Sequence, residues 1–93
     1  MASKTTVDAS HPLDPLSPVE IEAAVGILRK ERGTDERFRF VSVALQEPGK
    51  EAVRAHRPGR SVERRAFAVL LDREKAEAYE AIVSLNQGRL VSW

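Results

Sequence analysis

The chain has 93 residues, 42% of them hydrophobic and 31% charged, which fits one small folded domain and excludes an intrinsically disordered chain. Its 15 basic and 14 acidic residues leave a net charge of +1, which gives no overall basis for binding nucleic acid or a membrane. The absence of cysteine excludes disulfides and thiolate metal sites, and no run approaches the roughly 18 apolar residues of a membrane span. We therefore expect a soluble, cytoplasmic protein.

The first part of the chain divides into a tail and a lead-in. Residues 1–10 are polar and small without periodicity, so they are predicted to form a disordered tail. Residues 11–17 are proline-rich, and Pro12 and Pro15 favour extended backbone at the residues before them. Residues 18–93 are then expected to form the folded domain.

A helix is predicted over Pro18–Arg32, because its start carries several capping signals. Ser17 can accept hydrogen bonds from the first amides, Pro18 suits the first helical position, and Glu20 completes a capping box. Gly33 can end the helix in a left-handed conformation.

One face of this helix is apolar, which predicts that it packs against a sheet. Leu16 has the spacing of a hydrophobic staple with the first residue of the stripe. Gly26 costs helix stability, so we expect it to allow a close approach to the sheet. The stripe consists of Ile21, Ala24, Val25, Ile27 and Leu28.

Two strands are predicted next, over Arg37–Glu47 and Arg64–Asp72. In the first, apolar residues change parity near Phe40, so either both faces are partly covered or a β-bulge shifts the register. The connection Lys50–Ser61 contains Pro58-Gly59 and is predicted to be irregular. The second strand places Arg65, Phe67, Val69 and Leu71 on one face.

The segment Ala76–Trp93 favours a β-hairpin that the rest of the chain packs around. Apolar residues alternate from Tyr79 to Leu85, as expected for a strand with one buried face. Gly88 can take the positive φ of a tight turn, and Arg89–Trp93 resumes the alternation. A helix over Lys75–Ala81 is the alternative, since alanine and glutamate are good helix formers.

Helix followed by four mostly antiparallel strands predicts an α+β domain, with the helix laid across one face of a curved sheet in a cystatin-like arrangement. The sequence contains no complete catalytic motif. His11 and His56 lie in predicted irregular segments, so we expect solvated histidines and no metal site. Asp72 and Glu74 flank a turn and are expected to be solvated.

One stretch is locally basic, and a solvated surface loop is the favoured interpretation. A nucleic-acid interface would also need exposed aromatic residues or a recognition helix, and neither accompanies these charges. A small nucleic-acid binder therefore stays a minor alternative. The basic residues are Lys50, Arg54, Arg57, Arg60, Arg64 and Arg65.

Several segments, taken together, resemble the first of the two small N-terminal domains of copper amine oxidases. The start His11–Leu16 (HPLDPL) resembles that family's entry segment, and Phe38–Pro48 resembles its first strand with a Glu-Pro ending. Tyr79–Leu85 and Val91–Trp93 resemble its closing hairpin. The resemblance implies a non-catalytic domain of a primary amine oxidase that packs on the remaining domains of a homodimeric enzyme.

Such enzymes oxidise primary amines to aldehydes with a copper ion, held by three histidines, and a topaquinone made from the tyrosine of an Asn-Tyr-Asp/Glu motif. The resemblance places both cofactors in a large C-terminal domain. Tyr79 stands in Ala78-Tyr79-Glu80, outside that motif, so no catalytic, cofactor-binding or metal-binding residue carries over. A free-standing cystatin-like interaction module is the alternative, although the sequence lacks a Gln-x-Val-x-Gly hairpin.

Trp93 ends a short predicted strand, where a free terminus is poorly suited to hold a large aromatic side chain. We therefore expect the natural chain to continue beyond Trp93, and neighbouring domains to cover the apolar surface near it. The isolated chain is then expected to self-associate weakly through this region.

Overall fold

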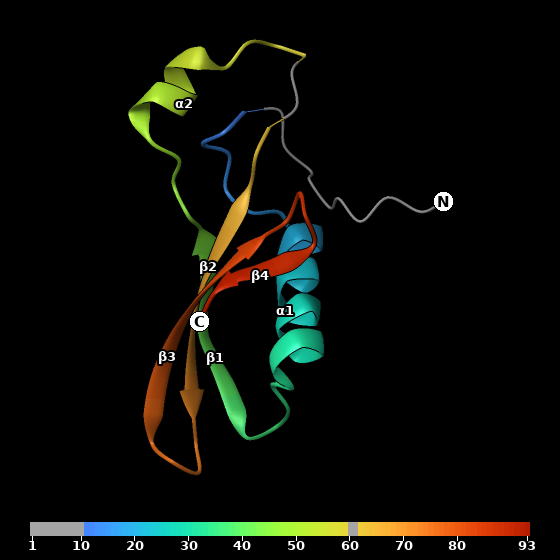
Figure 1. Ribbon diagram of the computed structural model, residues 1–93, viewed down its shortest axis with the longest axis vertical. Helices are drawn as coiled ribbons and strands as arrows, with labels where there is room; N and C mark the ends of the chain where they lie inside the picture. Colours follow the sequence, from blue (N-terminus) through green and yellow to red (C-terminus); the bar gives the residue numbers. More distant parts are fainter. Residues whose placement is uncertain (1–10, 60–61) are drawn as a thin grey trace, which may run out of the picture.

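The computed structural model describes residues 11–59 and 62–93, which form one α+β domain (Figure 1). The predicted tail, residues 1–10, lies outside this part. The elements are α1 (Pro18–Arg32), β1 (Phe38–Leu45), α2 (Lys50–Ala55), β2 (Arg65–Asp72), β3 (Glu77–Ser84) and β4 (Arg89–Ser92). The strands form an antiparallel sheet in the order β1-β2-β3-β4, so the predicted fold class is confirmed.

The start of α1 has the predicted capping box. The Ser17 hydroxyl oxygen accepts a hydrogen bond from the Glu20 amide at 3.2 Å, and the Ser17 amide donates to a Glu20 carboxylate oxygen at 3.0 Å. At the other end, Gly33 has φ 60° and its amide donates to the carbonyl of Arg29 at 3.0 Å. Both ends of the helix are therefore fixed by residues next to them in the sequence.

Replacing Ser17 with alanine is expected to lower the free energy of unfolding by about 0.5–2 kcal/mol, because the Glu20 amide loses its acceptor. Chemical denaturation of the parent and Ser17→Ala chains measures the difference from the two midpoints, provided that both unfolding free energies depend equally on denaturant concentration. Ser92→Ala is a matched control, since Ser92 is exposed at the end of β4. Equal midpoints for the parent and Ser17→Ala would show that the cap contributes nothing.

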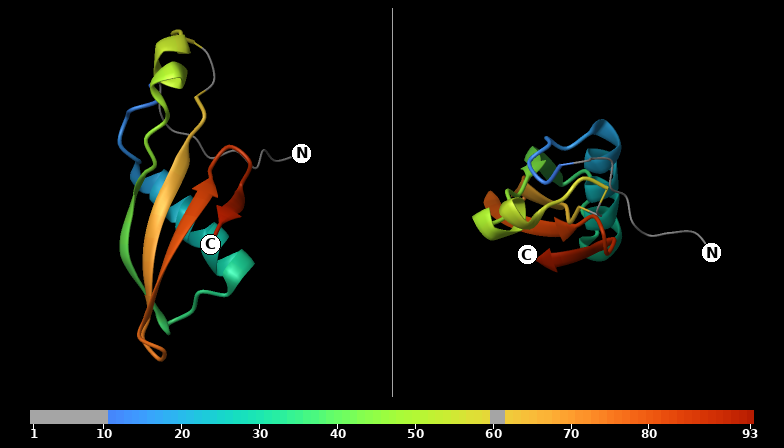
Figure 2. Two further views of the ribbon diagram at one scale, coloured as in Figure 1. Left: turned by 60° about the vertical axis from the view of Figure 1, so that its left-hand side comes forward. Right: turned by 90° about the horizontal axis from the view of Figure 1, so that it is seen from above.

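The hydrophobic core lies between α1 and one face of the sheet, where α1 packs mainly against β3 and β4 (Figure 2). Leu28 on α1 and Leu70 on the central strand β2 are fully buried there. The other buried members are largely small, which lets the helix lie close to the strands. They are Ala24, Phe38, Ala66, Ala68, Ala81, Val83 and Leu85.

The predicted role of Gly26 is wrong. A Cβ atom placed on Gly26 would meet nothing within 4 Å, and the residue is exposed. Each helical residue turns by about 100°, so Gly26 lies on the side opposite to Ala24 and Leu28. Of the predicted stripe, Ala24 and Leu28 are buried and Ile27 packs against the core, whereas Ile21 and Val25 are only half-buried.

The sheet contains the bulge that one of the two interpretations of the first strand required. The β1–β2 register shifts between Phe40 and Ser42, and the extra residue, Val41, is 60% exposed. A second shift separates Ile82 and Val83 in the β3–β4 pair. The helical alternative for Lys75–Ala81 is wrong because β3 already begins at Glu77.

The connection between β1 and β2 is more ordered than predicted, because α2 occupies six of its residues. Lys, Glu, Ala and Arg are good helix formers, and this local preference was hidden by the Pro58-Gly59 pair that follows. α2 lies at one end of the sheet, away from α1, and has no buried residue (Figure 1). No helix in the described ranges is long and apolar enough to cross a membrane.

Candidate functional site

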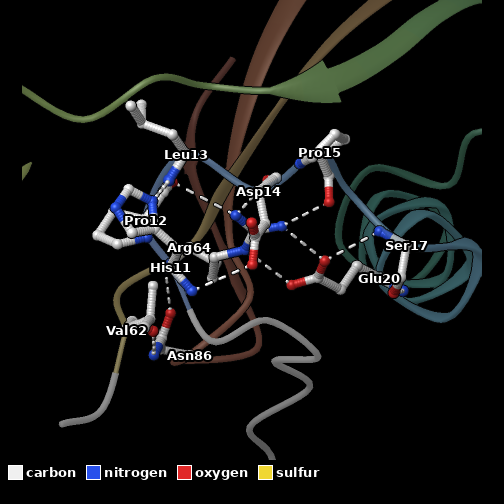
Figure 3. A network of polar contacts seen from close by, with 10 residues as sticks. All are labelled: His11, Pro12, Leu13, Asp14, Pro15, Ser17, Glu20, Val62, Arg64 and Asn86. Atoms are coloured by element: carbon white, nitrogen blue, oxygen red, sulfur yellow. Dashed lines mark hydrogen bonds and ion pairs between the residues drawn. The ribbon is translucent and has the colours of Figure 1, made fainter. Parts of the chain in front are cut away.

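The most elaborate polar site is built around Arg64, which immediately precedes β2 and is fully buried (Figure 3). Its guanidinium group pairs with Glu20 on α1 in a bidentate arrangement, Nε to Oε2 at 3.0 Å and Nη2 to Oε1 at 2.9 Å. Both side chains have no exposed surface. This geometry suits arginine, whose planar fork matches a carboxylate.

Arg64 also holds the lead-in that precedes α1. Its Nη1 donates to the carbonyl oxygens of Pro12 and Asp14, and its Nη2 donates to that of Pro15 at 2.9 Å. All five N–H donors of the guanidinium group therefore have acceptors. Residues 11–14 form a turn, closed by a hydrogen bond from the Asp14 amide to the His11 carbonyl, and residues 15–17 are irregular, so the carbonyls of Pro12, Asp14 and Pro15 have no helix or sheet partners and the arginine can bind them.

The backbone of Arg64 is fixed from the other side by the β3–β4 turn. Its amide donates to the Asn86 side-chain oxygen at 2.6 Å, and the Asn86 side-chain nitrogen donates to the carbonyl of Val62 at 2.9 Å. The Leu85 amide donates to the Arg64 carbonyl at 3.0 Å. The site thus joins the lead-in, α1, the start of β2 and the last hairpin through hydrogen bonds, which indicates a structural role.

The interpretation of Arg64 as part of a solvated basic loop is wrong. Arg64 shares its parity with the buried residues Ala66 and Leu70, so it starts the inward row of β2. This shared parity is the sequence feature that could have predicted the burial of Arg64. The partners could not be predicted, because Glu20 lies 44 positions away from Arg64 in the sequence.

The solvated-loop prediction holds only in part for the other basic residues, since Arg65 is a half-buried residue of β2 and Lys50 and Arg54 lie on α2. Lys50, Arg54 and Arg57 are exposed, and Arg57 donates to the carbonyl oxygens of Arg54 and His56. Arg60 lies outside the described residues.

At the turn between β2 and β3, the prediction of two solvated carboxylates is wrong for Asp72, which is buried, whereas Glu74 is exposed as expected. The Asp72 Oδ1 atom accepts hydrogen bonds from the amides of Glu74 and Lys75 at 3.0 and 3.1 Å. Its Oδ2 atom lies 3.5 Å from Nε of Arg37. Asp72 therefore organises the turn, and its carboxylate is not paired with a second one for acid–base chemistry.

The two histidines are neighbours, which sequence reasoning missed. The ring centroids of His11 and His56 are 5.4 Å apart in an edge-to-face arrangement, and Nδ1 of His11 accepts a hydrogen bond from the Leu13 amide. His56 also lines a hollow of about 490 Å³ between α2 and the lead-in. In the described ranges no three histidine, cysteine, aspartate or glutamate residues form a group that could hold a metal ion.

Trp93 is held more firmly than expected for a terminal residue. Its ring stacks on Tyr79 with centroids 5.0 Å apart and meets Phe38 edge-on at 6.1 Å. The Arg32 guanidinium lies 4.7 Å from the centroid of the Trp93 ring. The expectation that a free terminus is poorly suited to hold this side chain is wrong here, because Arg32 on α1, Phe38 on β1 and Tyr79 on β3 all contact the Trp93 ring.

The Tyr79 hydroxyl donates a hydrogen bond to the Glu77 carboxylate at 3.1 Å, and this bond is the main reason that the pKa of Tyr79 is raised above 10.0. Burial and the negative charges of Glu77 and Asp72 also raise it, while Arg37 lowers it. The raised pKa favours the fold at pH below 10.0, and this contribution is lost as the pH rises through the folded-state pKa.

Because Tyr79 is the only tyrosine, absorbance of its phenolate measures this ionisation without overlap from another phenol. The midpoint is expected above 10.0 in the folded chain, and Glu77→Gln is expected to lower it. Glu80→Gln serves as the control, since Glu80 is an exposed residue of the same strand. A midpoint that Glu77→Gln leaves unchanged would contradict the assigned cause.

The amino-acid sequence is similar to those of known proteins from one family. The family model described as the AGAO-like N2 domain matches residues 18–93. A primary amine oxidase and a copper methylamine oxidase of Arthrobacter sp. (strain P1) are each 50% identical over 91 residues, 98% of this chain and 14% of theirs. A primary amine oxidase of Klebsiella aerogenes is 37% identical over 86 residues, 89% of this chain and 11% of its own. The chain thus spans about one seventh of the length of its Arthrobacter relatives.

Proposed function

Because the chain belongs to the AGAO-like N2 domain family, the N-terminal part of copper amine oxidases, we propose that it serves as a non-catalytic domain of a primary amine oxidase. The 50% identity over almost the whole chain is the observation that carries this proposal. In the intact enzyme the chain would pack against the remaining domains, in a homodimer that oxidises a primary amine to an aldehyde.

The residues of this chain do not fit the copper ion or the topaquinone, which belong to the rest of the proposed enzyme. The sequence has two histidines, one fewer than the three that such a copper site uses. The Tyr79 hydroxyl is bonded to Glu77 and its ring is stacked on Trp93, as in a structural residue. We propose that the chain supplies no catalytic, cofactor-binding or metal-binding residue.

The proposed unit comprises residues 18–93 with residues 11–17 as its lead-in, and the tail at residues 1–10 stays a prediction. A cytoplasmic location, which the cysteine-free composition fits, also stays a prediction. We also propose that the chain binds neither a membrane nor a nucleic acid. The burial of Arg64 supports the last point, because it removes one cation from the basic stretch.

Expression of the full reading frame with copper tests the proposed function. The whole protein is expected to develop quinone absorbance and to release hydrogen peroxide from primary amines, and the 93-residue chain alone is expected to do neither. A reading frame that stops after Trp93 would overturn the proposal and favour a free-standing cystatin-like interaction module. Quinone formation by the chain alone would overturn its non-catalytic role.

A titration with duplex and single-stranded oligonucleotides at physiological salt tests the nucleic-acid alternative. Binding is expected to be weak and without sequence preference, because the exposed cations lack an element that reads bases. Sub-micromolar affinity would instead favour a nucleic-acid-binding module.

A further inference from the structure

The central strand β2 is apolar on both of its faces. Its inward row, Ala66, Ala68 and Leu70, is buried in the core. Its outward row contains Phe67 and two aliphatic residues, all half-buried in this chain. An antiparallel strand with one solvated face normally alternates apolar with polar residues, so β2 has the pattern of a strand covered on both sides. The outward row runs Phe67, Val69 and Leu71.

The neighbouring strands complete a narrow apolar stripe with a polar rim. Opposite residues of an antiparallel pair share a face, so the register identifies the neighbours of the outward row. Phe67 lies between Ala44 and Ile82, which extend the apolar area. The other neighbours are Ser42 and Glu80 beside Val69, and Arg39 and Ala78 beside Leu71. Apolar centres with polar and charged rims are typical of protein interfaces.

No described element of the chain covers this stripe. The left view of Figure 2 looks onto the open face of the sheet, with α1 behind it. α1 packs against the opposite face through Ala24 and Leu28, and α2 lies beyond one end of the strands. Arg39, Ser42 and Glu80 are exposed on the open face.

The small size of the stripe identifies the kind of partner. Five residues of β2 by three strands measure about 14 Å by 10 Å, on the order of 150 Å². A stand-alone complex usually buries about 800 Å² on each partner, centre and rim together, so such a small apolar centre favours a partner that needs only a limited contact. A partner in the same polypeptide needs less contact, because tethering gives it an effective concentration in the millimolar range.

We propose that the outward face of β2 docks onto another domain of the same amine oxidase polypeptide, with Phe67, Val69 and Leu71 at the centre of the contact. The proposal rests on the proposed function, since that function supplies the rest of the polypeptide. The Arthrobacter relatives have most of their length outside the segment that this chain matches. The partner surface is expected to be apolar at its centre and to offer polar groups to Arg39 and Glu80.

Hydroxyl-radical footprinting tests the proposal on the isolated chain and on the full-length enzyme. Labelling of Phe67 and Leu71 is expected to fall severalfold in the enzyme relative to the isolated chain. Val41, which is 60% exposed on the β1 bulge, is read in the same experiment to show whether protection is specific to the stripe. The isolated chain is measured at a low and a high concentration, so that protection by a second copy is recognised.

A matched pair of variants connects the protection to the stripe. Val69→Lys in the full-length enzyme is expected to restore labelling of Phe67 and Leu71, because a lysine at the centre of the contact opposes docking. Val19→Lys adds the same charge on α1, where Val19 is 54% exposed, and is expected to leave the protection intact. Thermal melts of the isolated chain with each substitution show that the fold itself is kept.

Each result decides the proposal. Protection in the enzyme that Val69→Lys removes and Val19→Lys leaves supports it. Equal labelling of Phe67 in the isolated chain and in an active enzyme overturns it and leaves the proposed function standing. Protection that grows with the concentration of the isolated chain assigns the stripe to a second copy and also overturns it. A full-length protein without amine oxidase activity contradicts the proposed function instead.

Discussion

Arg64→Ala is expected to lower the free energy of unfolding by about 3–5 kcal/mol, the largest effect of any single substitution in the Arg64 site. The substitution leaves the Glu20 carboxylate buried without its guanidinium partner. It also removes the donors that bind the carbonyls of Pro12, Asp14 and Pro15. Since a domain of this size is stable by about 5–15 kcal/mol, the loss is a large fraction of the total. Chemical denaturation measures it.

Arg65→Ala is the matched control for this experiment. Arg65 is the next residue and pairs with Glu63 at 3.3 Å, but the two side chains are 41% and 66% exposed. Such a pair contributes about 0–1 kcal/mol, so this variant is expected to stay close to the parent. If Arg64→Ala and Arg65→Ala destabilise the chain equally, the buried site has no special role in stability.

The double variant Arg64→Met/Glu20→Met distinguishes two free energies. One is the destabilisation caused by removing a single partner, and the other is the net contribution of the intact pair to stability. Removing both charges leaves no buried ion in the Arg64 site, so the double variant is expected to be more stable than Arg64→Ala alone. The carbonyls of the lead-in still lose their donors and the Ser17 amide loses its Glu20 acceptor, so the double variant is expected to remain less stable than the parent. A double variant less stable than Arg64→Ala would contradict the assignment of the cost to the Glu20 charge that has lost its guanidinium partner.

Leu28→Ala is expected to lower the free energy of unfolding by about 2–5 kcal/mol, because it opens a cavity between α1 and the sheet. Leu28 has no exposed surface and lies in the core with Ala24 and Ala81, whose short side chains cannot fill the space. For a domain of 60–100 residues each kcal/mol shifts Tm by about 4–8 °C, so a fall of about 10 °C or more is expected. Thermal melts followed by circular dichroism measure it.

Val19→Ala in the same helix is the control, since Val19 is 54% exposed and its loss opens no cavity. Its effect is expected to stay within about 0.5 kcal/mol, as for other surface substitutions. A Leu28→Ala variant that melts with the parent would show that α1 is not held by its contact with the sheet.

Features with local sequence causes were predictable. The helix start was identified because Ser17 and Glu20 are three residues apart and bond to each other. The bulge after Phe40 was one of two interpretations, since a change of parity within one strand leaves few other arrangements. The turn at Gly88 was also predictable from the local sequence, because glycine takes its φ of 64° without strain.

Features that depend on distant residues were not predictable. Nothing near Arg64 indicates that its partners lie on α1 and in the lead-in, and nothing in the sequence brings His11 beside His56. The burial of Asp72 was missed because acidic residues in turns are usually solvated, and its inward parity went unused. These residues take their environment from the folded topology, which pairs segments that local preferences do not relate.

The anchoring of the lead-in by Arg64 determines where a truncated version of this domain can begin. The family model starts at Pro18, but a chain cut there would lack the carbonyl acceptors of Pro12, Asp14 and Pro15. Three of the five guanidinium donors would then be buried or partly buried without acceptors, unless water entered the site. We therefore expect the smallest autonomous unit to start upstream of Pro12 and to include the seven residues before the helix, His11–Ser17.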